Sequence, residues 1–232
     1  MILEKIKVML ATTSKHKVAE VSEIIKEYAQ VYSMQDSPDV EETGKTFIEN
    51  SVIKAVTVGN MLNQKVMADD SGLCIKALDG FPGIYSARYM SDRSFEEKMQ
   101  SILTKMDGIS DRQAYFACAA TFYDPVTLTL VSYEARVYGN ISIQIMGNGG
   151  FGYDPIFIPQ GETKSFGQLP AEFKNKCSHR AQAFTELMEK TYPYHFYKIE
   201  PQSLNYTLSG DLWDYLYDLY KKEHGENGTF FP

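Results

Sequence analysis

The fold is decided first by the stretch Lys5-Ile6-Lys7-Val8-Met9-Leu10-Ala11, whose apolar residues predict a strand. Apolar residues then recur at helical spacing between Lys17 and Tyr28, which predicts a helix. The polar connection from Thr12 to Lys17 lies between the two elements. The chain therefore opens with a β-loop-α unit.

Further elements alternate along the chain and continue this pattern. The sequence predicts helices over Thr46 to Leu62, Ser94 to Met106 and Ser178 to Lys190, and strands over Lys65 to Ala68, Tyr115 to Tyr123 and Leu128 to Tyr138. The last two strands are joined around Asp124-Pro125, as in a hairpin. We therefore expect an α/β fold with a mixed sheet.

Composition excludes several classes of protein. The 232 residues are 44% hydrophobic and 23% charged, and no apolar run approaches the length of a membrane helix. A net charge of -7 argues against a general nucleic-acid surface, and charges near the start argue against a signal peptide. The three cysteines lack CxxC spacing, which argues against a zinc site or a disulfide framework. Cys177 lies close to His179 in sequence, but we expect this closeness to be incidental and not to mark a nucleophile and its base. These features predict a cytoplasmic protein without membrane or nucleic-acid partners.

The connection Thr12-Thr13-Ser14-Lys15-His16-Lys17 precedes a predicted helix, where free backbone N-H groups favour anions. Its three hydroxyls and Lys17 would add donors to a polyphosphate. Alternatively, Thr13 or Ser14 is the helix N-cap and the lysines are solvated.

Acidic residues mark two further positions. Asp69-Asp70-Ser71-Gly72 follows the predicted short strand, so we expect both carboxylates at a strand end, where one could bind Mg²⁺ and the other accept a proton. A simple polar turn is the alternative. Glu49 is either a metal ligand or the second half of a capping box with Thr46, and Lys54 either accompanies a phosphate or is solvated.

The densest chemistry lies in Gly149-Gly150-Phe151-Gly152-Tyr153-Asp154-Pro155, followed by Lys174 and Ser178-His179-Arg180. Glycines allow the backbone to approach a flat ligand closely, and Phe151 offers that ligand an aromatic face. The acceptor and donors that follow suit the edge of a nucleobase. A tight hairpin at Gly149-Gly150 beside an arginine-carboxylate pair on the surface is the alternative.

Several motifs, taken in order, resemble one family. They are Leu10-Ala11-Thr12, Glu42-Thr43-Gly44 with Thr46-Phe47 and Glu49-Asn50, Ala68-Asp69-Asp70-Ser71-Gly72-Leu73, Pro82-Gly83-Ile84-Tyr85-Ser86-Ala87-Arg88-Tyr89, and the two segments just described. Over about residues 6 to 190, the chain resembles the inosine triphosphate pyrophosphatase family. The loop Thr12-Thr13-Ser14 departs from the usual Thr-Gly-Asn of that family.

The resemblance implies a long twisted mixed sheet with flanking helices and two lobes around a central cleft, over residues 1–192. It leaves a C-terminal extension, 193–232, in which we predict a short amphipathic helix. It also implies a homodimer and Mg²⁺-dependent hydrolysis of ITP, dITP and XTP to the monophosphate and pyrophosphate, which keeps deaminated purines out of the nucleotide pool.

The resemblance also assigns roles to residues by position. It implies Asp70 as the proton acceptor with Asp69 beside it, Glu49 and Asp70 as metal ligands, and as substrate-binding residues Thr12, Thr13, Ser14, Lys17, Lys54, Ser71, Phe151, Gly152, Tyr153, Asp154, Lys174, Ser178, His179 and Arg180. His179 or Arg180 would donate to the 6-carbonyl of hypoxanthine or xanthine, whereas the amino group of adenine would leave those donors unpaired. Maf-like pyrophosphatases that prefer modified pyrimidines, and a nucleotide sensor without catalysis, are the competing hypotheses.

Overall fold

The computed structural model describes residues 5–33 and 40–191. Its six-stranded sheet has the order β2-β1-β3-β4-β5-β6. The strands are β1 (Ile6–Leu10), β2 (Ala29–Tyr32), β3 (Val66–Ile75), β4 (Gln113–Asp124), β5 (Thr129–Ile141) and β6 (Phe157–Pro159). β1 pairs in parallel with β2 and β3, whereas β5 and β6 pair antiparallel. The predicted mixed α/β sheet is therefore confirmed.

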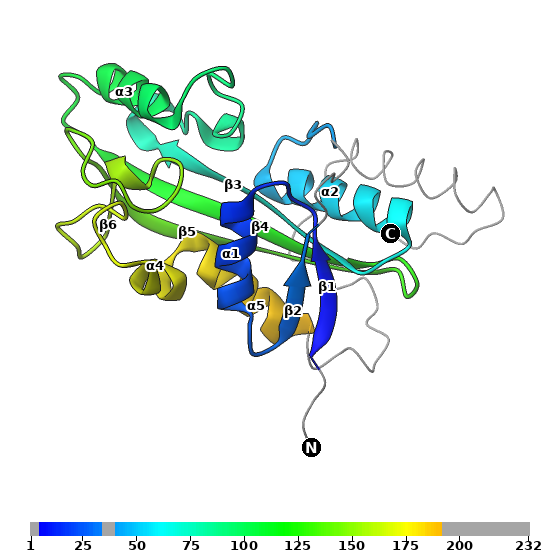
Figure 1. Cartoon of the computed structure of the whole chain (residues 1–232). Helices are drawn as coiled ribbons and strands as arrows, with labels where there is room; N and C mark the ends of the chain where they lie inside the picture. Colours follow the sequence, from blue (N-terminus) through cyan, green and yellow to red (C-terminus); the bar gives the residue numbers. More distant parts are fainter. Residues whose placement is uncertain (1–4, 34–39, 192–232) are drawn as a thin grey trace. The chain divides into compact units, whose positions relative to one another are not determined.

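The helices are α1 (Lys15–Ile24), α2 (Phe47–Leu62), α3 (Phe95–Lys105), α4 (Ala171–Cys177) and α5 (His179–Thr191), with short 3-10 turns η1 (Lys76–Leu78), η2 (Gly83–Tyr85) and η3 (Asp154–Ile156). Figure 1 shows their order along the chain. Local signals explain two of the starts. Thr46 caps α2 by accepting from the Glu49 N-H, and Ser94 with Glu97 forms the predicted capping box of α3.

The described residues belong to two compact units. Unit 1 contains residues 5–33, 40–70, 119–133 and 184–191, and unit 2 contains 71–118 and 134–183. The strands β3, β4 and β5 each contribute residues to both units. The central cleft, the domain boundary at residue 192 and the role of the extension stay predictions, and the predicted amphipathic helix lies outside the described residues.

Each unit has its own apolar core. In unit 1, Val8 and Leu10 of β1 are fully buried, and so are Val52 and Val58 of α2. In unit 2, a cluster built around Phe116 unites β3, α3, β4 and the segment that follows β5; it includes Leu73, Ile102, Phe157 and Phe166. Burial of these side chains provides the main driving force for folding of each unit.

The strand predicted at Lys65 to Ala68 is wrong in length, because β3 continues to Ile75. Asp69 and Asp70 therefore lie inside a buried strand and not at its end, although acids are poor strand formers. Ion pairing and hydrogen bonding with α1 and α2 compensate for this local preference. The first helix also ends earlier than predicted, at Ile24, and the chain then forms the short strand β2 beside β1 (Figure 1).

Candidate active site

The polar connection between β1 and α1 forms the start of the helix. Ser14 is the N-cap, and its hydroxyl accepts a hydrogen bond from the Lys17 N-H at 3.4 Å. The Ser14 N-H in turn donates to Oγ1 of Thr12 at 3.2 Å, while Thr13 is exposed. No acidic side chain occupies the first turn of α1. The predicted cap at Ser14 is therefore confirmed, whereas Lys17 pairs with Asp69 and is not merely solvated. The positive end of the helix stays suitable for an anion.

Two lysines of unit 1 are held by carboxylates. Nζ of Lys17 lies 3.0 Å from Oδ2 of Asp69, and Nζ of Lys54 lies 2.5 Å from Oε1 of Glu42. The Lys54 ammonium also donates to the backbone carbonyl of Asp69 at 3.0 Å. Although burial lowers it, these carboxylates hold the pKa of Lys54 above its usual value. Lys54 is therefore a paired cation and not a solvated one.

Asp70 points to the other side of β3 from Asp69, as consecutive residues of a strand do. Its side chain is buried, and its Oδ2 accepts a hydrogen bond from Nδ2 of Asn50 at 2.9 Å. Burial raises the pKa of Asp70 to about 6, Lys54 opposes that rise, and the negative charge of Glu42 adds to it. A carboxylate with such a pKa is suited to accept a proton near neutral pH.

The second acid beside Asp70 is Glu42, which the sequence analysis did not select. Glu49, predicted as a metal ligand, directs its Oε2 to the Lys45 N-H at 2.6 Å, at the start of α2. Glu49 thus makes a capping contact, whereas Glu42 pairs with Lys54 and acts electrostatically on Asp70. The only sequence signal for Glu42 was its place at the head of the motif Glu42-Thr43-Gly44.

Asn50 is the other residue of unit 1 that sequence reasoning missed. Its side-chain oxygen accepts from the Gly44 N-H at 2.8 Å, while its nitrogen donates to Asp70. A Cβ atom at Gly44 would come within 2.7 Å of that same oxygen, so only glycine fits there. Asn50 thereby fixes both the loop that carries Glu42 and the orientation of Asp70.

Among residues 5–33 and 40–191, no three His, Cys, Asp or Glu side chains are grouped so that they could hold a metal ion by themselves. Magnesium often takes only one or two protein carboxylates and completes its shell with water and substrate phosphates. The hard oxygen donors of Glu42 and Asp70 fit that requirement.

In unit 2, the glycine-rich loop folds around the carboxylate of Asp154. Its Oδ2 accepts from the Phe151 N-H at 2.5 Å and from Nζ of Lys174 at 2.6 Å. Gly150 has φ of 75°, and a Cβ atom there would collide with the Asp154 carboxylate. Asp154 and Lys174 are both buried. This ion pair therefore fixes the loop that presents Phe151.

The Phe151 ring is partly exposed and is supported by α3. Its centroid lies 5.3 Å from that of Phe95, in an edge contact, and Nζ of Lys98 lies 4.7 Å from the Phe95 centroid. A Cβ atom at Gly152, whose φ is 68°, would lie 3.5 Å from the Phe95 ring. Phe95 was not selected from the sequence. Its contacts hold an aromatic face in place beside the glycine-rich loop.

Tyr153 belongs to the core of unit 2. Its ring is buried against Phe95 at 5.6 Å, and its hydroxyl donates to the Ser86 carbonyl at 3.0 Å. The Tyr153 side chain therefore packs in this core, and its role in substrate binding stays a prediction.

The start of α5 carries three buried polar residues. Ser178 is the cap, since its hydroxyl accepts from the Ala181 N-H at 3.1 Å. The His179 ring stacks on Phe116, with centroids 4.7 Å apart and an angle of 11° between the planes. Nη2 of Arg180 donates to the Ser71 hydroxyl at 2.9 Å. These contacts orient the imidazole and the guanidinium.

Cys177 precedes this cluster, and burial raises the pKa of its thiol. A thiol with a raised pKa is a poor nucleophile, which argues against the Cys177-His179 pair.

Each unit thus brings together its own set of predicted residues. Unit 1 assembles the helix start, two lysines and the acids, a combination suited to a metal-bound polyphosphate. Unit 2 assembles a supported aromatic face with oriented donors, a combination suited to a heterocyclic ring. The peptide bond between Asp70 and Ser71 joins one residue of each set within β3.

Comparisons with known proteins agree with the resemblance inferred from the motifs. Residues 8–190 match the family model described as the Ham1 family. A "dITP/XTP pyrophosphatase" of Listeria monocytogenes serotype 4b (strain F2365) is 40% identical over 188 residues, 78% of this chain and 92% of the relative. Its namesake from Halalkalibacterium halodurans is 42% identical over 186 residues, 77% of this chain and 95% of the relative.

Solved structures show the same fold. The Ham1 protein of Staphylococcus aureus has a TM-score of 0.72 and 36% identity, over 80% of this chain and 97% of its own. A HAM1 protein from Coxiella burnetii has a TM-score of 0.73 and 32% identity, over 80% of this chain and 98% of its own. Within the described ranges, the helices are too short or too polar to cross a membrane.

Proposed function

Because the chain belongs to the Ham1 family, we propose that it hydrolyses ITP, dITP and XTP to the nucleoside monophosphate and pyrophosphate. Relatives named dITP/XTP pyrophosphatase, 40% and 42% identical and covered almost over their full length, support this activity. The observation that carries the proposal is Asp70, a buried carboxylate with a pKa of about 6, set beside Glu42 and Lys54.

The triphosphate is handled by the residues of unit 1. Its charges would be met by the N-H groups at the start of α1 and by the ammonium groups of Lys17 and Lys54. Both lysines are already oriented by carboxylates, at 3.0 Å from Asp69 and 2.5 Å from Glu42. Fixed cations aimed at the phosphates stabilise charge that develops in the transition state without further reorganisation.

Hydrolysis requires water to attack the α-phosphorus. Asp70 accepts a proton from that water, a bond forms between the water oxygen and phosphorus, and the bond to the β-phosphate breaks. Pyrophosphate leaves with the electron pair of that bond. Asn50 acts as a positioning residue, because its amide fixes one oxygen of Asp70.

Magnesium is part of the proposal. Glu42 and Asp70 would hold it together with phosphate oxygens, and the ion would supply charge neutralisation of the triphosphate. Glu49, whose Oε2 accepts from the Lys45 N-H at 2.6 Å, stays a predicted ligand, and Glu42 is proposed beside it because its charge acts on Asp70.

The purine is selected by the residues of unit 2. The Phe151 ring, supported by Phe95, provides the stacking face. Arg180 donates from Nη2 to the Ser71 hydroxyl at 2.9 Å, which orients the guanidinium, and we expect this guanidinium to donate to a 6-carbonyl acceptor. Adenine presents an amino group there, which would leave a buried donor unsatisfied.

The remaining parts of the proposal come from the resemblance: a homodimer, a cytoplasmic location and removal of deaminated nucleotides from the pool. Sedimentation of the purified chain tests the assembly. A monomer at micromolar concentration would contradict the homodimer.

The activity is tested by measuring pyrophosphate release from ITP, XTP, ATP, UTP and dUTP, with Mg²⁺ or with EDTA. We expect release from ITP and XTP with Mg²⁺ and little from the others. Preference for dUTP or UTP would favour a Maf-like activity, and binding of ITP without release would favour a sensor. Asp70→Asn should bind ITP and lose at least several hundredfold in turnover, since it removes the base. A variant that keeps a tenth of the rate would contradict the assignment.

A further inference from the structure

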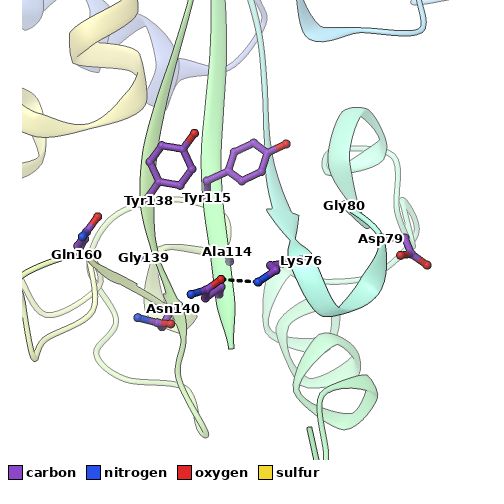
Figure 2. Close-up of a pocket in the computed structure, with 10 residues that line it drawn as sticks. Lys76, Asp79, Gly80, Ala114, Tyr115, Tyr138, Gly139, Asn140 and Gln160 are labelled. Atoms are coloured by element: carbon purple, nitrogen blue, oxygen red, sulfur yellow. Dashed lines mark hydrogen bonds between the residues drawn. The ribbon is translucent and has the colours of Figure 1, made fainter. Parts of the chain in front are cut away.

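Unit 2 contains a pocket of about 680 Å³ that the proposed reaction does not use. It lies where β3 and β5 end and β4 begins, with the turn after β3 on one side and the segment after β6 on the other (Figure 2). The residues that give it its chemical character are Lys76, Gln113, Tyr115, Tyr138, Asn140 and Gln160. This volume falls within the usual range of small-ligand sites.

The pocket is distinct from the base-binding set. Tyr115 and Phe116 are consecutive residues of β4, so their side chains point to opposite faces of the sheet. Phe116 stacks on His179, whereas Tyr115 lines the pocket. The Tyr115 side chain therefore lies on the other face of the sheet from Phe116 and His179.

Two tyrosine rings form an aromatic wall. The centroids of Tyr115 and Tyr138 are 5.7 Å apart with an angle of 49°, and Figure 2 shows the rings side by side. The Arg136 guanidinium lies 5.0 Å from the Tyr115 centroid and is itself held by Glu134 at 2.7 Å. Tyr115 is hydrogen-bonded to Cys74. Tyr115 is thus fixed, while Tyr138 is 56% exposed and accessible to a ligand.

The polar groups around the rings carry little positive charge. Nζ of Lys76 donates to Oε1 of Gln113 at 2.8 Å and lies 3.2 Å from Asp111, so its charge is neutralised locally. Asp79 lies at the opposite side of the pocket from Gln160 (Figure 2). These carboxylates disfavour a phosphate group, because like charges repel.

Amide side chains provide the remaining edge. Asn140 and Gln113 are exposed at strand ends, and Gln160 follows β6. Asn140 and Gln160 carry both donors and an acceptor, and Gln113, whose Oε1 accepts from Lys76, adds the donors of its amide nitrogen. Such groups match the alternating donors and acceptors on the edges of a nucleobase. Stacking on aromatic side chains, which any nucleobase can make, is the other common element of base recognition.

We propose that this pocket binds a neutral nucleoside or free nucleobase, stacked on Tyr138 and Tyr115 and hydrogen-bonded by the surrounding amides. The ring faces supply apolar contact, and the amides supply orientation. Among the described lining residues, Lys76 is paired with Asp111, so no unpaired cation is left to bind a phosphate group. The preferred ligand is therefore the nucleoside or nucleobase and not the nucleotide. The proposal goes beyond the hydrolysis of triphosphates and does not depend on it.

The test is titration of the ¹⁵N-labelled full chain with inosine, followed by amide chemical shifts. We expect shifts at residues 113–115 and 138–140. Tyr138→Ala should weaken this binding by about tenfold, since one stacking contact is lost. Tyr85→Ala is the matched control, because Tyr85 is 57% exposed and lies elsewhere in unit 2. The control should bind inosine as the wild type does.

Further arms separate this pocket from the proposed active site. Phe151→Ala removes the stacking face there, so shifts at residues 138–140 that persist in this variant support the second site. Turnover of ITP by Tyr138→Ala should equal that of wild type. The proposal is overturned if inosine shifts no amide of the pocket, or if IMP or maltose binds there more tightly than inosine does. It is also overturned if Tyr138→Ala changes the sedimentation of the chain, because that result would identify this face as a contact between copies of the chain.

Discussion

Replacing Asp70 with asparagine should stabilise the metal-free protein at alkaline pH, although it removes the proposed catalytic base. Burial is the largest contribution to the raised pKa of Asp70, which reaches about 6 from an ordinary value of 3.8. A carboxyl with a raised folded-state pKa favours the folded protein while it is protonated. That contribution is fully present below pH 3.8 and is lost as the pH rises through about 6.

At pH 8 the ionised Asp70 should therefore lower the free energy of unfolding by about 3 kcal/mol, and at pH 5 by about half of that. Asparagine cannot ionise, and its side-chain oxygen can still accept from Nδ2 of Asn50. Asp70→Asn should consequently exceed the wild type in stability by up to about 3 kcal/mol at pH 8. The difference should shrink as the pH falls.

Urea unfolding in EDTA, at pH 5, 6, 7 and 8, measures the free energy of unfolding directly. Asp107→Asn is the matched control, because it removes one exposed carboxylate and leaves the buried cluster intact. An Asp70→Asn variant no more stable than wild type at pH 8, or a stability difference that does not change with pH, would refute the reasoning. Either result would mean that the cations around Asp70 fully offset the loss of stability caused by burying its ionised carboxylate.

Further substitutions test the two sets of residues. Arg180→Ala should lower the preference for ITP over ATP by about tenfold or more, because a charge-assisted hydrogen bond contributes about 1.5 to 3 kcal/mol; equal losses of kcat/KM on both would contradict a role at the base. Phe95→Leu should raise KM for ITP about threefold to tenfold with little change in kcat, since an aromatic pair with Phe151 contributes about 0.5 to 1.5 kcal/mol; lost kcat with unchanged KM would argue against that support. Glu42→Gln should raise the Mg²⁺ concentration needed for half-maximal turnover far more than Glu49→Gln, and the opposite order would return the metal to Glu49.

Signals that act within one turn of the chain were predictable from sequence. The caps at Thr46 and Ser94 depend on residues three positions away, and both helices begin where these residues indicated. The length of β3 was not predictable in this way. Asp69 and Asp70 disfavour a strand locally, and the groups that offset this preference, Lys17 and Asn50, come from separate helices.

The candidate site shows the same division between residue type and orientation. The motifs indicated which residue types carry the chemistry, but they gave no sign that Glu42 pairs with Lys54 and acts electrostatically on Asp70. Glu49 lies three residues after Thr46, as in a capping box, and its carboxylate accepts from the Lys45 N-H at 2.6 Å. Its role as a metal ligand stays a prediction. The contact between Glu42 and Lys54 joins residues from a loop and a helix, so no local spacing predicts it. The burial of the Tyr153 ring was likewise not predictable from local sequence, because its contacts with Phe95 and Ser86 depend on the fold.

Every cation predicted to bind substrate is already held by a protein group: Lys17 by Asp69, Lys54 by Glu42, Lys174 by Asp154 and Arg180 by Ser71. A buried cation without such a partner would be costly, so these contacts allow the charges to be buried before the ligand arrives. A phosphate group must then compete with these contacts or add to them. The free energy of phosphate binding is therefore smaller than it would be with the same number of unpaired lysines. The residue types therefore predict the class of substrate, whereas the affinity for it depends on how readily each of these protein groups releases its cation.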